Sequence, residues 1–319
     1  MNKNEPDIRE NYIHDRFVII APGRSKRPNQ TIKPVSPKPT AEEIQKCVFC
    51  PHNIDKEPFV YKDGQGKKWD VKVIANKFPI VSKKFTEAYG KHEIVIETPN
   101  HGQELADLSV PHIEKILRAY QKRTSEISKD QKIKYIFIFK NNGGKAGASI
   151  EHAHSQIFAT SFLTPHIIEK LTRAKEYQVK HGCCYYGELA KKESAKNSPL
   201  RIFKDKYFSV FAPYASTYSY EAWVIPFRHV DNITALSKAE IKSFAKIIKC
   251  LTGELTKVED IAYNFYFHQA LTDSDEHFYF RLCPRRSVHA GIELGSRLIV
   301  NTMPPEEAAK FYRQGFKGC

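Results

Sequence analysis

Short apolar runs recur along the chain, separated by longer segments in which apolar residues return at helical spacing. Each short run is bounded by polar or turn-forming residues, which is typical of a strand. The runs expected to form strands cover residues 17–20, 71–74, 93–96, 135–139, 157–160, 207–211, 221–225, 261–268 and 277–283. Apolar residues on one face predict helices. These are expected at residues 108–128, 167–180 and 237–257, with a shorter helical segment at 41–46.

The order of these elements in the second part of the chain repeats the order in the first. In each part a long helix lies between strand pairs. This pattern predicts an α+β fold built by duplication, with antiparallel sheets flanked by helices. A polar, lysine-rich stretch at residues 182–199 separates the two parts. We therefore expect an N-terminal half of residues 1–182 and a C-terminal half of residues 183–319.

Composition places the chain among globular proteins of the cytoplasm. Of its 319 residues, 41% are hydrophobic and 27% charged, as in ordinary folded domains. No apolar stretch has the length of a membrane span, and the polar N-terminus is unlike a signal peptide. The seven cysteines do not suggest a secreted disulfide framework. We therefore expect no membrane partner and a reducing compartment.

The formal net charge of +14 permits two interpretations. Solvated surface lysines explain most such surpluses, whereas an anionic partner would give the charge a function. Basic residues do not cluster with interleaved aromatic residues, which a nucleic-acid interface would require. The sequence therefore favours small phosphorylated ligands over nucleic acid.

A histidine pair follows a glycine-rich loop in the first half. The loop runs from Asn141 to Ser149, and His152-Ala-His154-Ser-Gln156 comes directly after it. Small residues let backbone N–H groups approach a phosphate closely. On a strand, the two histidines and the glutamine would share one face. A polar strand beside a flexible turn is the alternative for either part alone, but the combination indicates a phosphate site.

Cys47-x-x-Cys50 supplies half of the ligands of a tetrahedral zinc site. A lone pair of this spacing is also compatible with redox chemistry or with two incidental thiols. Any zinc would need further ligands, and histidine is the obvious supplier. The first half offers several candidates, among which sequence order does not choose. They are His52, His92, His101, His112, His152 and His154.

A histidine next to a phosphate site can act as a nucleophile toward phosphorus. Attack by a neutral imidazole forms a phosphoramidate and divides one transfer into two steps. The second ring nitrogen must be held by a hydrogen bond, for which a backbone carbonyl suffices. An amide such as that of Gln156 could stabilise charge on the phosphate oxygens.

These motifs together resemble the galactose-1-phosphate uridylyltransferase family, a branch of the histidine-triad superfamily. The similarity extends through nearly the whole chain and is sharpest around the histidine pair. The matching segments are Arg24-Ser-Lys-Arg-Pro28, Cys47-Val-Phe-Cys50, Ala75-Asn-Lys-Phe78, Thr98-Pro-Asn-His101, Gly147-Ala-Ser-Ile-Glu-His-Ala-His-Ser-Gln156 and Gly291-Ile-Glu-Leu-Gly295. The resemblance implies two tandem histidine-triad-like halves, the second of them degenerate, and a homodimer.

The resemblance also implies roles for individual residues. The ligands of a structural Zn²⁺ would be Cys47, Cys50, His101 and His152. His154 would be the nucleophile, and Gln156 would bind the α-phosphate. Residues implied to bind substrate are Arg24, Arg27, Asn76, Asn141, Gly147, Ser149 and Glu293. Arg24 and Arg27 would meet phosphates, across a dimer interface in one arrangement.

The chain departs from the family at several positions. Ala153 separates the two histidines where well-known members have proline, and Lys77 follows Asn76 where they have aspartate. Some members hold a second metal in a histidine-rich strand of the C-terminal half. The matching segment, His277-Phe-Tyr-Phe-Arg281, has too few histidines, so no such site is expected.

Four functions fit these observations to different degrees. The family resemblance favours a UDP-glucose–hexose-1-phosphate uridylyltransferase that uses nucleotide-sugar and hexose-1-phosphate substrates. The Gly-Ala-Ser run and the segment Gly291–Ser296 also resemble a sister group that transfers adenylyl from ADP-glucose to phosphate. A zinc-stabilised binding module without turnover would not need both His152 and His154. A histidine-triad hydrolase would carry a third histidine where Gln156 stands.

Overall fold

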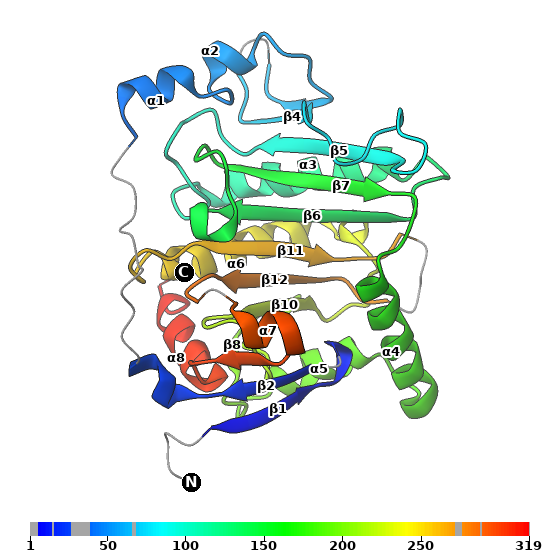
Figure 1. Cartoon of the computed structure of the whole chain (residues 1–319), viewed down its shortest axis with the longest axis vertical. Helices are drawn as coiled ribbons and strands as arrows, with labels where there is room; N and C mark the ends of the chain where they lie inside the picture. The colour runs from blue at the N-terminus through cyan, green and yellow to red at the C-terminus, as the bar shows by residue number, and fades with distance from the viewer. Residues whose placement is uncertain are drawn as a thin grey trace.

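One ten-stranded sheet runs the length of the molecule in this computed structural model (Figure 1). The structure describes residues 6–14, 16–26, 39–65, 68–271, 276–287 and 289–318. Every neighbouring pair in this sheet is antiparallel. In spatial order its strands are β3 (Tyr61–Asp63), β4 (Val71–Ala75), β5 (Gly90–Ile96), β7 (His154–Thr160), β6 (Tyr135–Asn142), β11 (Tyr263–His268), β12 (Tyr279–Pro284), β10 (Ala222–Pro226), β9 (Phe208–Phe211) and β8 (Arg201–Lys204).

The strand order contains the predicted repeat. Read from its outer edge inward, the first half runs β3, β4, β5, β7, β6, and the second half runs β8, β9, β10, β12, β11. The two orders are identical in connectivity, and β6 pairs with β11 at the centre. The halves therefore share one continuous sheet, where the sequence had suggested separate sheets. The division at residue 182 stays a proposal.

Two long helices cover one face of the sheet side by side (Figure 1). They are α3 (Val110–Ile127) and α6 (Lys238–Leu255). Ser109 caps α3 by accepting a hydrogen bond from the His112 N–H, and Ser237 caps α6 in the same way through Glu240. Both caps satisfy amides that the first helical turn leaves without partners. The helices thus begin where the sequence places a serine before an amphipathic stretch.

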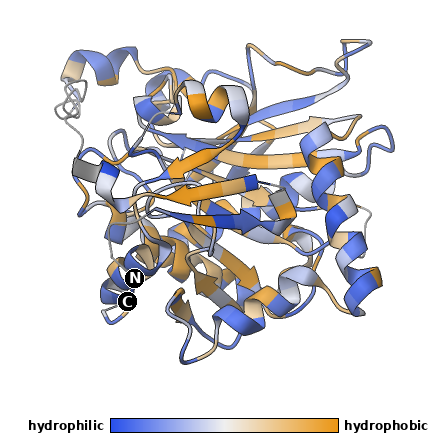
Figure 2. Ribbon diagram, turned by 60° about the horizontal axis from the view of Figure 1, so that its bottom comes forward, coloured by the Kyte–Doolittle hydropathy of each residue, from blue (hydrophilic) through white to orange (hydrophobic). Residues whose placement is uncertain are grey.

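The hydrophobic core lies between these helices and the sheet and spans both halves. Ile113, Ile116, Leu117 and Tyr120 form the buried face of α3, as its periodicity predicts. Hydrophobic residues concentrate along the central strands (Figure 2). Since strands β6 and β11 bring together side chains from both halves, burial of apolar surface stabilises the two halves as a unit.

The remaining elements include the strand expected at residues 17–20 and the helices expected at 41–46 and 167–180, together with several short elements that were not predicted. A small second sheet contains β1 (Asp7–Asn11), β2 (Arg16–Ile20) and β13 (Ile299–Asn301), with β13 parallel to β2. The remaining helical elements are η1 (Tyr12–His14), η2 (Pro22–Lys26), α1 (Ala41–Lys46), α2 (Pro51–Ile54), η3 (Gly144–Ala146), α4 (Pro165–His181), α5 (Tyr185–Glu193), η4 (Ile233–Ala235), α7 (Gly291–Ser296) and α8 (Pro305–Gly315). Within the described part of the chain, no helix has the length and apolar character needed to cross a membrane.

A buried ion pair fastens α3 to the sheet. Arg123 of α3 donates two hydrogen bonds to the Glu93 carboxylate of β5, at 2.8 and 2.7 Å. We predict that Arg123→Ala lowers the free energy of unfolding by about 3–5 kcal/mol, because it leaves a buried carboxylate without its cation. Arg118→Ala, which removes a half-exposed partner of Glu114, should cost less than about 1 kcal/mol. Urea denaturation of both variants measures the difference, and equal costs would contradict the assignment.

Candidate active site and metal centre

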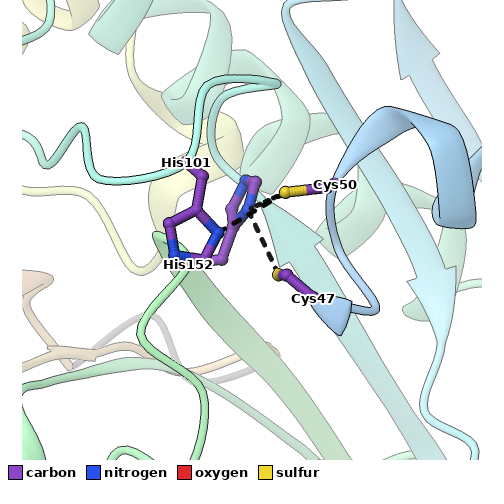
Figure 3. Close-up of side chains that lie close together, drawn as sticks. All are labelled: Cys47, Cys50, His101 and His152. Atoms are coloured by element: carbon purple, nitrogen blue, oxygen red, sulfur yellow. Dashed lines mark hydrogen bonds between the residues drawn. The ribbon is translucent and has the colours of Figure 1, made fainter. Parts of the chain in front are cut away.

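Four potential metal ligands converge at one end of β7 (Figure 3). Cys47 and Cys50 lie between α1 and α2, His101 lies in the turn after β5, and His152 lies just before β7. The Nδ1 atom of His152 is 3.6 Å from each sulfur, and Nδ1 of His101 is 3.4 Å from the sulfur of Cys50. All four ligand atoms lie within 4.8 Å of one another.

This spacing fits a single tetrahedral ion. With Zn–S bonds of about 2.3 Å and Zn–N bonds of about 2.0 Å, neighbouring sulfur and nitrogen ligands lie roughly 3.5 Å apart. Burial, together with the adjacent Cys47, raises the pKa of the Cys50 thiol to about 12. A bound cation would reverse this preference, because it stabilises the thiolate form.

His152 is held in the tautomer that a metal ligand needs. Its Nε2–H donates to the backbone carbonyl of Thr98 at 2.8 Å, so Nδ1 keeps its lone pair and faces the two thiols. The residue is completely buried, and burial lowers its pKa to about 4. The imidazole is therefore neutral at ordinary pH. Sequence reasoning placed His152 on the strand, but β7 begins two residues later, at His154.

His154 shows the opposite assignment of its two ring nitrogens. Its Nδ1–H donates to the backbone carbonyl of His152 at 2.8 Å, which leaves Nε2 with the lone pair. Burial lowers the pKa of His154, which favours the neutral ring with Nε2 unprotonated. Phe49, between the two cysteines in sequence, packs against the His154 ring with a centroid distance of 5.2 Å. The segment from Cys47 to Cys50 thus helps to position the His154 ring.

Gln156 lies two residues further along β7 and is held by His92 of β5. The Nε2–H of His92 donates to Oε1 of Gln156 at 2.8 Å. The other nitrogen of His92 accepts from the side-chain amide of Asn76 at 3.3 Å and from the Ile80 N–H at 3.4 Å. Because its oxygen is engaged, Gln156 presents its amide nitrogen as the free donor end, suited to a phosphate oxygen. Sequence reasoning considered His92 only as a possible zinc ligand.

A buried charge cluster supports the backbone of the nucleophile candidate. The Lys140 ammonium of β6 pairs with Glu97 at 2.7 Å and Glu104 at 2.9 Å, and it donates to the His154 carbonyl at 3.4 Å. Burial disfavours the charged amine, yet the carboxylates of Glu104 and Glu97 keep the pKa of Lys140 above its ordinary value. Sequence reasoning did not identify this cluster, because its residues lie in three separate segments.

The glycine-rich loop leaves β6 beside this cluster. Gly143 and Gly147 have positive φ angles of 81° and 84°, a region that favours glycine. Asn264 of β11 donates to Oδ1 of Asn141 and to the Ala146 carbonyl, both at 2.8 Å. These bonds tie the loop of the first half to a strand of the second. The exposed Ser149 lies at the end of this loop.

The remaining predicted residues lie elsewhere. Arg24 is exposed in η2, and Glu293 lies in α7, where its carboxylate accepts from the Ala290 N–H at 2.8 Å. In Figure 1, α7 lies in front of the second half of the sheet and η2 lies at the same end of the molecule, whereas His154 is in the first half. Arg27 lies outside the described residues. The substrate roles of these three residues stay predictions.

Taken together, the fold and the site define a duplicated α+β protein with a Cys/Cys/His/His metal-binding group next to a neutral, oriented histidine. A family model for the galactose-1-phosphate uridyl transferase N-terminal domain matches residues 1–164. The chain belongs to this family. A second model, described as a domain of unknown function (DUF4921), matches residues 108–312.

Individual relatives extend this similarity over the whole chain. An ADP-glucose phosphorylase of Arabidopsis thaliana is 29% identical, with 98% of this chain and 94% of the relative covered. A galactose-1-phosphate uridylyltransferase of Thermotoga maritima is 28% identical, with coverage of 97% and 98%. The crystal structure of an Arabidopsis ADP-glucose phosphorylase with bound ADP-glucose superimposes with a TM-score of 0.85 at 28% identity, covering 97% of this chain and 99% of that one.

Proposed function

We propose that this protein is a nucleotidylyltransferase that carries a nucleoside monophosphate on Nε2 of His154, with UDP-glucose and a hexose 1-phosphate as its substrates. The observation that carries the proposal is the hydrogen bond from the Nδ1–H of His154 to the His152 carbonyl. It directs the lone pair of the ring to Nε2 and leaves that nitrogen available for attack on phosphorus. Membership of the galactose-1-phosphate uridyl transferase family supports the choice of substrates.

The reaction proceeds as two displacements at the α-phosphorus. In the first, Nε2 of His154 bonds to phosphorus, and the bond from phosphorus to the bridging oxygen breaks, releasing glucose 1-phosphate. In the second, a phosphate oxygen of galactose 1-phosphate attacks, the P–N bond breaks, and UDP-galactose leaves. The amide of Gln156, fixed by His92, would donate to a nonbridging oxygen in both steps. Asn141, Gly147 and Ser149 would hold the phosphates, and Asn76 the nucleoside.

The metal group is assigned a structural role in this proposal. Zn²⁺ suits two thiolates and two imidazoles in a closed tetrahedron. The residues that would hold it are Cys47, Cys50, His101 and His152. With its ring fixed in this way, His152 would keep its carbonyl aligned with Nδ1 of His154. The ion itself takes no part in bond making.

A second candidate is adenylyl transfer from ADP-glucose to phosphate. It is favoured by the similarity to the Arabidopsis ADP-glucose phosphorylase, in sequence and in structure. The chemistry at His154 would be the same, with adenosine in place of uridine and inorganic phosphate as the acceptor. Only the base and acceptor contacts separate the two candidates.

A homodimer would complete the substrate site. Arg24 and Glu293 belong to η2 and α7, which lie at the end of the molecule formed by the second half of the sheet (Figure 1). A partner chain therefore offers a route by which they could reach a phosphate or a hexose near His154. We also propose that the halves at residues 1–182 and 183–319 arose by duplication. A cytoplasmic location fits substrates of this kind.

The nucleophile assignment predicts a covalent intermediate. Wild-type protein incubated with UDP-glucose labelled in the α-phosphate should acquire an acid-labile, base-stable label, and His154→Ala should acquire none. Turnover of this variant should fall by about 10⁴-fold or more, while its fold and metal content stay normal. His181→Ala, which changes an exposed histidine of α4, is the matched control. Labelling of His154→Ala at the wild-type level would disprove the assignment.

The same assignment predicts how activity depends on pH. Attack needs neutral His154, and burial lowers the pKa of this residue. The rate of label formation should therefore decline toward acidic pH with an apparent pKa below the ordinary histidine value of about 6.5. Single-turnover rates measured across this range would show it. An apparent pKa at or above the ordinary value would contradict the assignment of a buried, neutral nucleophile.

The metal assignment predicts that Cys47→Ser loses the tightly held zinc. A serine hydroxyl is a poor replacement for a thiolate. The zinc content measured by elemental analysis should therefore fall by about one ion per chain, and the stability of the folded protein should fall with it. Cys183→Ser removes a thiol outside this group and should keep that zinc. Full retention of zinc by Cys47→Ser would refute the assignment.

The base preference distinguishes the two candidate reactions. We expect kcat/KM for UDP-glucose with galactose 1-phosphate to exceed that for ADP-glucose with phosphate, because the family model that matches is that of the uridylyltransferases. Coupled assays with both substrate pairs on one preparation give the ratio. A preference for the adenine pair would identify the protein as an ADP-sugar phosphorylase and leave the His154 chemistry intact.

A further inference from the structure

The glycine-rich loop of the first half is held by residues of the second half. Asp260, just before β11, forms an ion pair with Lys145 of the loop. A Cβ atom added at Gly143 would lie only 3.0 Å from Cβ of Ala262, so the loop backbone packs closely against this segment. Asn264, in β11 itself, donates two hydrogen bonds to the first half. The second half therefore contacts the loop at three positions.

These hydrogen bonds fix which end of the Asn264 amide faces the first half. The carbonyl of Ala146 is 2.8 Å away and can only accept, so the atom of Asn264 that faces it must be the nitrogen. The same nitrogen lies 2.8 Å from the side chain of Asn141, its direct partner across β11 and β6. The atom of Asn141 that faces this donor is consequently the oxygen, Oδ1. The amide nitrogen of Asn141 points away from Asn264.

Asn141 stands beside the proposed nucleophile. β6 pairs with β7 as far as Phe139 and Gln156, and two residues further along each strand stand Asn141 and His154. Because alternate residues of a strand share one face, Asn141 lies on the face that carries the side chains of His154 and Gln156. Its amide nitrogen is 3.9 Å from the place that a Cβ of Gly147 would occupy. Among the described residues, none accepts a hydrogen bond from this nitrogen.

Two side-chain amides next to His154 are thus oriented in the same way. His92 donates to the oxygen of Gln156, and Asn264 donates to the oxygen of Asn141. Each amide is left with its nitrogen as the available end. Donors that are already oriented stabilise charge on phosphate oxygens without a cost of reorganisation during the reaction.

We propose that Asn264 is a positioning residue, which holds the amide of Asn141 with its nitrogen toward the phosphate bound beside His154. The inference rests on the proposed function and gives the second half a part in the chemistry of the first. Without the bond from Asn264, the Asn141 amide can turn and present its oxygen, which repels the oxygens of a phosphate.

Replacing Asn264 by an acid of the same shape tests the orientation. The carboxylate in Asn264→Asp cannot donate and attracts the amide nitrogen of Asn141, which turns that amide the wrong way. The single-turnover rate of label formation from saturating UDP-glucose should fall at least about tenfold in Asn264→Ala and at least about tenfold further in Asn264→Asp. A purely structural role predicts the reverse order, because aspartate keeps the volume of asparagine. Asn197→Ala and Asn197→Asp, at an exposed asparagine between α5 and β8, are the matched controls.

The same substitutions in an Asn141→Ala background show whether Asn264 acts through Asn141. With no amide left to orient, alanine and aspartate at position 264 should give rates within about threefold of each other. A tenfold difference that persists in this background would be a direct effect of the new charge and would overturn the proposal. Wild-type rates in Asn264→Ala and Asn264→Asp would overturn it as well. Retention of the tightly held metal shows that each variant has folded.

Binding measurements separate this proposal from the proposed transfer reaction. If wild-type protein accepts no label from UDP-glucose or ADP-glucose, the transfer reaction is wrong, and calorimetric dissociation constants for these two nucleotide sugars decide the role of Asn264. Asn264→Asp should bind them at least about tenfold more weakly than Asn264→Ala, and Asn141→Ala should remove that difference. Equal affinities of the two Asn264 variants, or no binding by the wild type, would overturn the proposal.

Discussion

The hydrogen bond between the Nδ1–H of His154 and the carbonyl of His152 is the interaction on which the chemistry of the site depends. It selects one tautomer of a buried imidazole, and in that tautomer the lone pair lies on Nε2, as the proposed role of nucleophile requires. The carbonyl is well placed because the His152 ring is anchored on both sides, by Thr98 and by the two thiols. The potential metal ligand and the proposed nucleophile thus lie two residues apart on one backbone segment.

The second half keeps this framework but not its chemistry. Tyr279 and Arg281 occupy the positions in β12 that His154 and Gln156 occupy in β7. Arg281 forms a buried ion pair with Glu221 at 2.6 Å, and the Tyr279 hydroxyl accepts from the Lys170 ammonium at 2.6 Å. Both side chains are engaged with neighbouring groups, and β12 has no imidazole at the position that matches His154. Under the proposed duplication, the first half would be the reactive copy and the second half a structural one.

Sequence patterns predicted the parts of the fold in which burial is periodic. The buried face of α3 and the apolar strand β6 carry enough regular positions to define their class. Strands such as β3 and β8 are short and only partly buried, so their residues carry no comparable signal. The merging of the halves into one sheet depends on pairing between β6 and β11, a long-range contact that periodicity does not encode.

The candidate site was predictable only where its residues are adjacent in sequence. His154 and Gln156 stand in one motif, whereas the choice of His101 over other histidines came from family resemblance. His92 could not be assigned to Gln156 from sequence, because the two meet only through the pairing of β5 with β7. The grouping of Cys184, His229 and His277 was missed for the same reason, since these three residues come from distant segments.

The pairing of β6 with β11 at the centre of the sheet suggests how such a protein could have originated. A chain consisting of one half alone would end its sheet at an unpaired strand edge, which invites association. Two copies of that chain could pair these edges antiparallel, as β6 and β11 do, and the antiparallel arrangement is the one that a twofold axis imposes. Under the proposed duplication, the centre of the present sheet would correspond to the interface of an ancestral dimer. Fusion into a single polypeptide would have made that interface permanent and allowed one copy to diverge.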